Sequence, residues 1–274
     1  MFATEMENQV AARPNNRLLV ASAGILLVLF IEFVFSILLQ QRAQHQLLSD
    51  FDKVVSQAAT AVGQTTVSPL PDTAPAYGSP VALIQIPKLN LTQVVVEGST
   101  SNFTQSGPGH VPGTVLPGQA GESVIIGRRT SFGAPFFKIG DLKNGDVIKV
   151  TTVEGPSIYK VIAAKDAEAN TGLNTLKLVT SNPPILATGS QSVVAQLQAK
   201  PYPDTPRNSR IAPNSNQFAL MLLVLQILAI LLYFTRGIYR KFGPLIGWML
   251  LTPLLAATLL ALTLTFDTLL PATL

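Results

Sequence analysis

The stretch VIIGRRTSFGAPFFKIGDLKNGDVIKV (residues 124–150) runs from one short β-type segment, through a turn, into another. β-Branched residues fill its two ends, and glycine, proline and asparagine interrupt its middle, as is typical of strands joined by tight loops. Two adjacent arginines, Arg128 and Arg129, stand where the first segment ends. In a chain with only 12% charged residues, two such cations can complete a surface, hold an anion or belong to a catalytic site.

The same pattern of short β-type runs separated by turn residues extends on both sides of this stretch, from Val81 to about Ala199. It includes the runs VALIQIP, TQVVVEG, SVIIG, DVIKVTTV, SIYKVIAAKDA, LKLVTS and SVVAQLQA, which are separated by glycine, proline and asparagine. Seven or eight short strands in about 120 residues, with little helical periodicity between them, predict a small β-barrel or sandwich.

The rest of the chain is unusually apolar. The 274 residues are 47% hydrophobic with a mean hydropathy of +0.37, and a soluble domain carries about twice the charge fraction found here. The apolar residues concentrate at 18–39, 218–234 and 244–266, and segments of this length can cross ~30 Å of hydrocarbon. The sequence therefore predicts three transmembrane helices at these positions.

Basic residues predict the orientation of these spans. Arg13 and Arg17 precede the first span, and the short loop 235–243 is also basic. Short cationic loops stay in the cytoplasm, so we expect 1–17 and 235–243 inside and the middle of the chain outside the cytoplasmic membrane.

Three polar residues, Glu32, Gln226 and Asp267, lie within or at the ends of the expected spans, where polar side chains usually face other helices. Glu32 could pair with Gln226 or with a partner protein.

The expected barrel, 81–199, is connected to the membrane on both sides. Apolar residues at helical spacing predict a stalk helix at 40–62, on which His45 is a solvated residue. A proline-rich linker follows at 63–80, and a second linker, 200–216, leads back to the membrane.

Composition excludes several kinds of chemistry. The chain has no cysteine, which rules out disulfides, zinc–thiolate sites and thiol catalysis. The net charge of +4 is mild and its basic residues are scattered, so nucleic-acid binding has no support. We expect no metal and no cofactor.

Four stretches together carry a family resemblance. IQIPKLNLTQVVVEG, GPGHVPGT, the stretch 124–150 and LVTSNPP resemble, in order and spacing, the landmarks of the sortases, most strongly the class D/E type of Gram-positive bacteria. The resemblance covers 81–199. It implies an eight-stranded sortase β-barrel and a cysteine transpeptidase that cuts a sorting motif and joins proteins to the cell wall or to pili.

The sequence departs from this pattern at the catalytic positions that the resemblance implies. Arg128 stands in place of the general acid/base histidine, and Ser181 in place of the nucleophilic cysteine. The oxyanion-stabilising arginine is expected near Ser190 or Gln191, and neither residue is an arginine.

The replacements lack an evident base. A serine needs one to become a useful nucleophile, and a guanidinium has no acceptor and stays protonated. His110, in GPGHVPGT, is interpreted as a structural residue. Lys177 lies four residues before Ser181 along one strand, roughly 13 Å away and beyond hydrogen-bond reach.

Two interpretations of this site remain. Arg128 and Arg129, with the hydroxyls of Thr130 and Ser131 and opposite Ser181, could bind a carboxylate or phosphate. Alternatively, solvated residues fill an abandoned site.

At the level of the whole protein, one hypothesis is a non-catalytic sortase-fold protein of the cell surface that binds a peptide, a surface protein or an active sortase. The other is a divergent peptidase or transpeptidase that acts on sorting signals with Ser181 as nucleophile.

Overall fold

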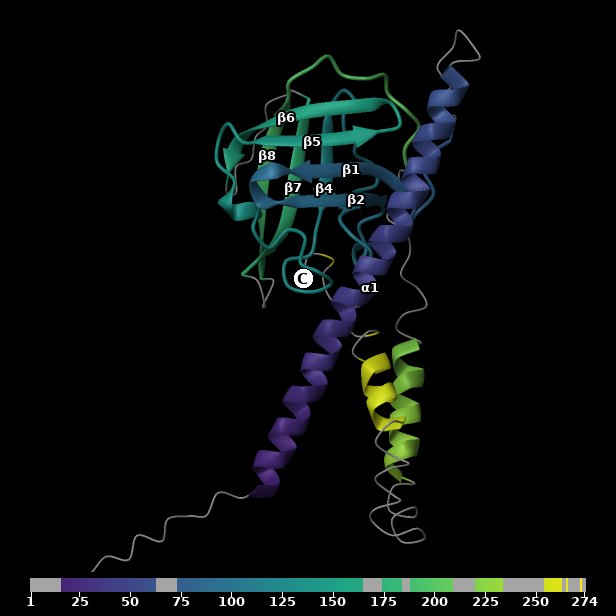
Figure 1. The fold of residues 1–274 in the computed structure, drawn as a ribbon, viewed down its shortest axis with the longest axis vertical. Coiled ribbons are helices and arrows are strands. Elements are labelled where there is room, and N and C mark those ends of the chain that lie inside the picture. Colours follow the sequence, from purple (N-terminus) through teal and green to yellow (C-terminus); the bar gives the residue numbers. More distant parts are fainter. Residues whose placement is uncertain are drawn as a thin grey trace, which may run out of the picture.

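The computed structural model describes residues 16–62, 73–164, 174–183, 188–208, 220–233 and 254–262, together with 265 and 272. A long helix, α1 (Asn16–Val62), precedes eight strands and leans against one side of them (Figure 1). The strands are β1 (Pro80–Ile86), β2 (Leu91–Glu97), β3 (Gly109–His110), β4 (Glu122–Ile126), β5 (Val147–Thr152), β6 (Gly155–Ala164), β7 (Thr175–Asn182) and β8 (Gly189–Leu197). Three short turns of helix lie between strands: η1 (Pro87–Leu89), α2 (Ser101–Thr104) and η2 (Ile139–Asp141).

The eight strands form a closed barrel in the order β1-β2-β3-β4-β7-β8-β6-β5. The pairs β2–β3 and β4–β7 are parallel and the other neighbours are antiparallel. The prediction of a mainly β protein with an eight-stranded barrel is therefore confirmed.

Alternation along the strands explains the core. In β1, Ile84 and Ile86 are fully buried, whereas Leu83 and Gln85 lie half-buried on the outer face, as expected when successive side chains point to opposite sides of a sheet. The buried apolar cluster contains Val81, Ala82, Ile84, Ile86, Val95, Leu116, Ile125, Phe136, Ile139, Leu142, Ile148, Val150, Tyr159, Val161, Leu176, Leu178, Val193, Ala195 and Leu197.

One side of β2 is covered by α1. Only the last two residues of β2 pair with β3, and among the described residues no strand lies beside its first five on that side. Gln44 of α1 accepts a hydrogen bond from the main-chain N–H of Val94 at 2.7 Å and donates one to the Val94 carbonyl at 3.1 Å. A third bond, to the carbonyl of Ser106, measures 2.7 Å. The side-chain amide of Gln44 thus takes the place of a neighbouring peptide group.

Two glycines make room for α1. A Cβ on Gly107 would overlap the side-chain amide of Gln44. Gln40, which is only 3% exposed, donates a hydrogen bond of 2.8 Å to the side chain of Gln93. Its Oε1 lies 2.7 Å from the position that a Cβ on Gly133 would occupy. The helix therefore packs closely against two loops as well as against β2.

The segments before and after the barrel are joined. Asn208 donates hydrogen bonds to the carbonyl of Pro75 at 2.7 Å and to Glu97 at 3.0 Å. Gln119 donates to the hydroxyl of Thr205 at 2.7 Å. The chain consequently enters and leaves the barrel side by side.

The expected membrane spans find no support in the part of the chain that the structure describes, where no helix is both long and apolar enough to cross a bilayer. The expected stalk, 40–62, is continuous with the helix before it in α1. The loop 235–243, most of 244–266, Asp267 and the side chain of Glu32 lie outside the described residues.

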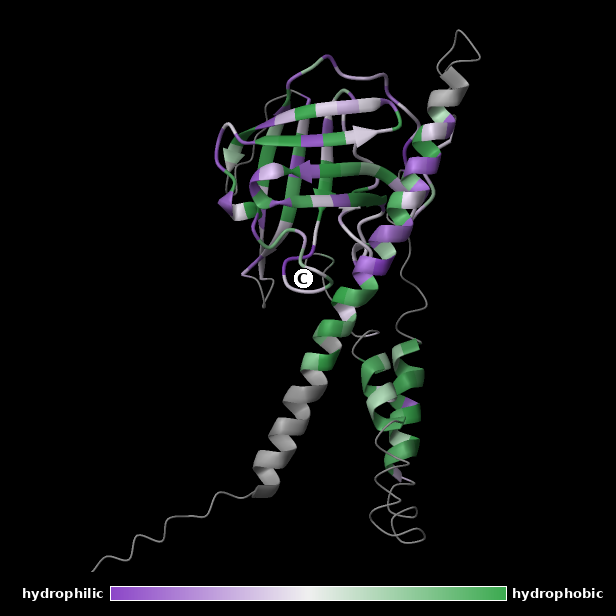
Figure 2. Cartoon of the chain, in the orientation of Figure 1, coloured by the Kyte–Doolittle hydropathy of each residue, from purple (hydrophilic) through white to green (hydrophobic). Residues whose placement is uncertain are grey.

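Large apolar side chains are nevertheless exposed on both helical segments. In Figure 2 the ribbon is coloured as hydrophobic on α1 below the barrel and along 220–233. Gln226, in the second of these segments, is also exposed. On α1 the exposed apolar residues include Phe30, Ile31, Phe33, Val34, Phe35 and Leu38.

Candidate functional site

The adjacent arginines and Ser181 lie at the ends of two neighbouring parallel strands. Ile126, the last residue of β4, pairs with Val179 of β7, and the N–H of Gly127 donates to the Val179 carbonyl at 3.0 Å. Because parallel strands run side by side in one direction, the residues that follow both strands meet at one end of the barrel.

Arg128 points into the protein. Its side chain is fully buried and donates hydrogen bonds to the hydroxyl of Ser131 at 2.8 Å and to the carbonyl of Ser101 in α2 at 3.0 Å. The guanidinium also stacks on Phe132, 4.9 Å from the ring centroid, a cation–π geometry. These contacts tie the loop after β4 to α2, so Arg128 has a structural role.

The loop that follows has an unusual backbone. Phe132, Gly133 and Ala134 all have positive φ angles, of 46°, 72° and 45°. Non-glycine residues rarely adopt this conformation, and such strain persists only where surrounding contacts enforce it. Here the contacts come from Arg128 on one side and Gln40 on the other.

Arg129, and not Arg128, lies against the end of β7. Its Nη1 donates a hydrogen bond of 2.6 Å to the Ser181 carbonyl and one of 3.3 Å to the side chain of Asn182. The Ser181 hydroxyl is buried and has no hydrogen-bond partner among the described residues. Thr130, which also belongs to the expected binding set, is half-buried.

Ser190 and Gln191, the two residues expected near the position of the oxyanion-stabilising arginine, lie on β8 and face different sides of the sheet. Ser190 pairs directly with Ser181, and Gln191 pairs with Thr180. Directly paired residues share one face of a sheet, so Ser190 lies on the Ser181 side. Gln191 is buried and packs against Gly140 of η2.

His110 is remote from this site and fully engaged. His110 pairs with Ile125 of β4, and Ile125 pairs with Leu178 of β7, which lies three residues before Ser181. Two strand spacings across the sheet and three residues along β7 therefore place His110 about 14 Å from Ser181. Its Nδ1 lies 2.6 Å from Glu97, and its Nε2 lies 3.0 Å from the carbonyl of Val115.

The hydrogen bonds of the His110 ring fix where its protons are. Thr114 also lies 3.0 Å from Nε2, but its single hydroxyl proton is donated to the Val111 carbonyl. Nε2 therefore carries a proton and donates it to Val115. On the other side of the ring, Nδ1 faces the Glu97 carboxyl group. The buried pair accordingly holds the chain together and cannot serve Ser181.

No group of three or more histidine, aspartate or glutamate side chains that could hold a metal ion occurs within the described ranges. Titratable groups with altered pKa values lie elsewhere on the barrel. Burial raises the pKa of Glu154, and burial also raises the pKa of Tyr159 to about 12.

Comparisons with known proteins agree with the fold. Residues 84–197 match the family model described as the Sortase domain. Over these residues the chain is similar to the Sortase domain family. Sortase D of Bacillus subtilis (strain 168) is 28% identical over 91 residues, which are 33% of this chain and 44% of that protein. The chain thus spans less than half the length of this curated relative.

The solved structures to which this chain is similar include two sortases. The sortase D5 transpeptidase of Clostridium perfringens has 23% sequence identity and a TM-score of 0.46, and the match covers 58% of this chain and 99% of that one. Sortase E1 of Streptomyces coelicolor, solved with a tripeptide in its active site, has 24% identity and a TM-score of 0.41, over 52% of this chain and 98% of that one.

The structure adds residues that the sequence did not single out. Asn182 joins Arg129 and was detectable as the neighbour of Ser181. Ser101 and Phe132, which hold Arg128, carry no sequence signal, because serine and phenylalanine are ordinary residues in a loop or helix.

Proposed function

We propose that this chain is a non-catalytic, class D/E-like sortase-domain protein of the bacterial cell surface that binds a surface protein or peptide, with an active sortase as one such partner. The observation that carries the proposal is the state of Arg128. It occupies the position of the family's histidine, and its guanidinium is committed to Ser101, Ser131 and Phe132.

The surroundings of Ser181 support a non-catalytic role, because no described side chain near its hydroxyl can act as a base. Activation of a serine needs a base within about 3.2 Å or one water away. Arg129 donates hydrogen bonds and cannot accept a proton. Both ring nitrogens of His110 are engaged elsewhere, and Lys177 lies four residues back along β7, roughly 13 Å away.

The polar side chains at the end of β7 could serve in binding instead of catalysis. Arg129 and Asn182 offer hydrogen-bond donors beside Ser181, and Thr130 follows Arg129 on the same loop. Arg128 supports this site from within by fixing the loop. We therefore assign recognition to Arg129, Thr130, Asn182 and Ser181, and a positioning role to Arg128.

Membrane attachment is part of the proposal and rests on sequence. We place spans at 18–39, 218–234 and 244–266, with the sortase domain outside the cytoplasmic membrane. The exposed apolar side chains of α1 between Phe30 and Leu38 support this arrangement.

The absence of cysteine allows a direct test of this topology, because a maleimide can then label only the cysteine that is introduced. In intact cells a membrane-impermeant maleimide should label Lys160→Cys on the barrel. Tyr239→Cys in the basic loop should be labelled only after permeabilisation. Labelling of both in intact cells would overturn the topology.

A divergent enzyme is the second candidate, and one observation favours it. The buried Ser181 hydroxyl makes no hydrogen bond among the described residues, so no such bond has to break before it reacts, and the Arg129 guanidinium lies nearby to stabilise negative charge.

One experiment separates the two functions. The full chain in detergent is incubated with a sorting-motif peptide and an amine nucleophile, and products are followed by mass spectrometry. The non-catalytic proposal expects peptide binding without cleavage, in the parent chain and in Ser190→Ala alike. Cleavage that Ser181→Ala abolishes and Ser190→Ala preserves would establish the enzyme instead.

A further inference from the structure

The outer side of β2 presents unpaired main-chain groups at Thr92. The N–H and C=O of Val94 point away from β1, because both bond to Gln44 of α1. In an extended strand, the main-chain N–H and C=O groups of residues two apart point in the same direction. The N–H and C=O of Thr92 therefore also point away from β1. Thr92 is exposed, and neither group has a hydrogen-bond partner among the described residues.

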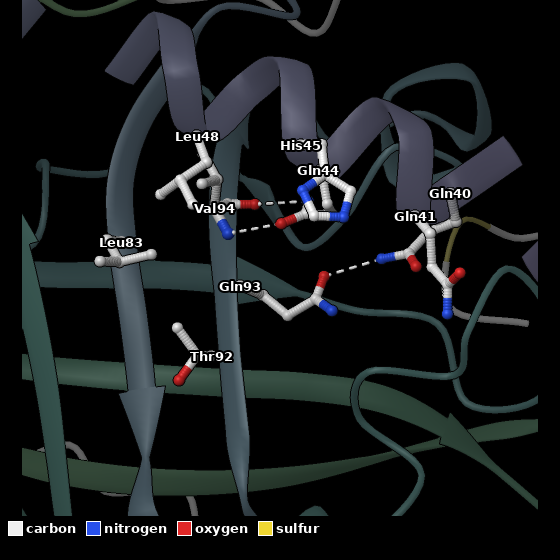
Figure 3. A pocket seen from close by; sticks show the side chains of 9 residues that line it. All are labelled: Gln40, Gln41, Gln44, His45, Leu48, Leu83, Thr92, Gln93 and Val94. Atoms are coloured by element: carbon white, nitrogen blue, oxygen red, sulfur yellow. Dashed lines mark hydrogen bonds between the residues drawn. The ribbon is translucent and has the colours of Figure 1, made fainter. Parts of the chain in front are cut away.

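A hollow of about 180 Å³ lies between α1 and this part of the barrel (Figure 3). Its walls are Gln40, Gln41, Gln44, His45, Leu48, Leu83, Thr92, Gln93 and Val94. Three of these described residues are apolar and four are glutamines, and none of the nine is an aspartate, glutamate, lysine or arginine. Gln93 uses its oxygen to accept from Gln40, which leaves its amide nitrogen available for another partner.

A second hollow of about 270 Å³ lies on the other side of Thr92. It is lined by Gln85, Pro87, Asn90, Leu91, Thr92 and Lys149. Gln85 pairs with both Thr92 and Lys149, so the three side chains form a row across three strands on the outer face. Lys149 is exposed and supplies the only charge in this hollow.

The contact of Gln44 indicates which ligand suits this edge. A planar amide, with one donor and one acceptor, already bonds to Val94 as a neighbouring strand would. An extended peptide offers the same pair of groups at every second residue, which is also the interval between Val94 and Thr92. A sugar has no such repeat.

We propose that the β2 edge site, meaning the Thr92 main chain with the two hollows beside it, binds a short extended peptide. Main-chain hydrogen bonds to Thr92 hold the peptide, an uncharged side chain enters the hollow beneath α1, and an acidic side chain faces Lys149. Because Gln44 occupies the next position along the edge, the contact is limited to three or four peptide residues.

This site shares no residue with the group around Arg129 and Ser181. The inference is therefore separate from the proposed function, and either can fail without the other.

Peptide N-methylation tests the proposal on the unchanged protein. The full chain in detergent is titrated against a fluorescein-labelled Val-Thr-Val-Thr-Glu peptide by fluorescence polarisation. We expect saturable binding that weakens at least tenfold when alternate peptide nitrogens are methylated in the register facing Thr92, since each N–H donor is replaced by a methyl group that cannot donate, whereas methylation of the other nitrogens, which face away from β2, should weaken binding much less. Equal binding of the methylated and parent peptides would overturn the proposal, as would the absence of saturable binding.

Two variants locate the peptide. Thr92→Pro removes an N–H that the barrel does not use and should weaken binding at least fivefold, whereas Thr92→Val keeps the N–H and should bind as the parent does. Lys149→Gln should abolish the preference for the glutamate peptide over its glutamine counterpart. A chitin tetrasaccharide that binds in a Thr92-dependent way while the peptide does not would identify a glycan site and contradict the proposal.

Discussion

Arg129 and Ser181 are joined by a hydrogen bond of 2.6 Å from the guanidinium to the main-chain carbonyl. This bond links the loop after β4 to the end of β7. The neighbouring Arg128 turns the opposite way and reaches α2. Two adjacent arginines thus have different contacts: Arg128 holds the loop from inside, and Arg129 lies against the end of β7.

The different burial of the two arginines predicts different stabilities. Arg128→Ala should lower the free energy of unfolding by about 2–4 kcal/mol, because it removes a buried side chain with two hydrogen bonds and an aromatic contact. Arg129→Ala should cost about 1 kcal/mol or less, since Arg129 is only half-buried. Thermal unfolding followed by circular dichroism measures both, and equal losses would refute the structural role of Arg128.

The buried pair His110–Glu97 should behave as one unit. Removing one partner of a buried pair commonly costs about 3–5 kcal/mol, because the other is left uncompensated. We expect Glu97→Gln and His110→Gln each to destabilise strongly and the double variant to lose much less than their sum. Chemical unfolding of the four proteins in a double-mutant cycle measures this coupling. Additive losses would show that the two side chains do not share a proton.

Glu154 should make the barrel less stable as pH rises. Burial raises the pKa of this carboxyl, and the nearby charge of Asp204 adds to the effect, so the folded state holds its proton at pH values where the unfolded chain has lost it. Stability from this group is fully present below its unfolded pKa and is lost as pH rises through the folded pKa. Glu154→Gln should remove this loss while still accepting the hydrogen bond of Gln119.

Melting temperatures of the parent chain and Glu154→Gln between pH 4 and 8 check this prediction. The difference between them should grow in favour of the variant as pH rises. A constant difference would contradict the raised pKa.

Gln44 should be important for the attachment of α1 to the barrel. Gln44→Ala removes three hydrogen bonds and should cost about 2–3 kcal/mol, at roughly 1 kcal/mol for each bond. The Val94 amide should then exchange its hydrogen faster, as seen by hydrogen–deuterium exchange. Gln41→Ala is the matched control, since Gln41 is exposed one turn away and should leave exchange unchanged. Slow exchange in both variants would mean that another group protects Val94.

The barrel could be predicted from the sequence, because each strand carries its own signal. Alternating apolar residues and the glycine and proline turns mark the strands whatever their partners. Closure and strand order depend on pairings between distant segments, such as β4 with β7, for which a local pattern holds no information. The docking of α1 was missed for the same reason, since Gln44 and Val94 lie 50 residues apart.

The site was predicted only in part. The sequence identified Arg128, Arg129 and Ser181 as neighbours but treated the arginines as one pair of cations. Their opposite directions follow from the left-handed loop after them and from Ser101, 27 residues upstream, and neither is visible in the run GRRTSFGA.

Among the described residues, we expect no side chain that can take a proton from the Ser181 hydroxyl. Intact-protein mass spectrometry of the full chain, after incubation with a sorting-motif peptide, tests this most directly. We expect an unmodified mass at every time point. An added acyl mass that maps to Ser181 and disappears in Ser181→Ala would contradict it.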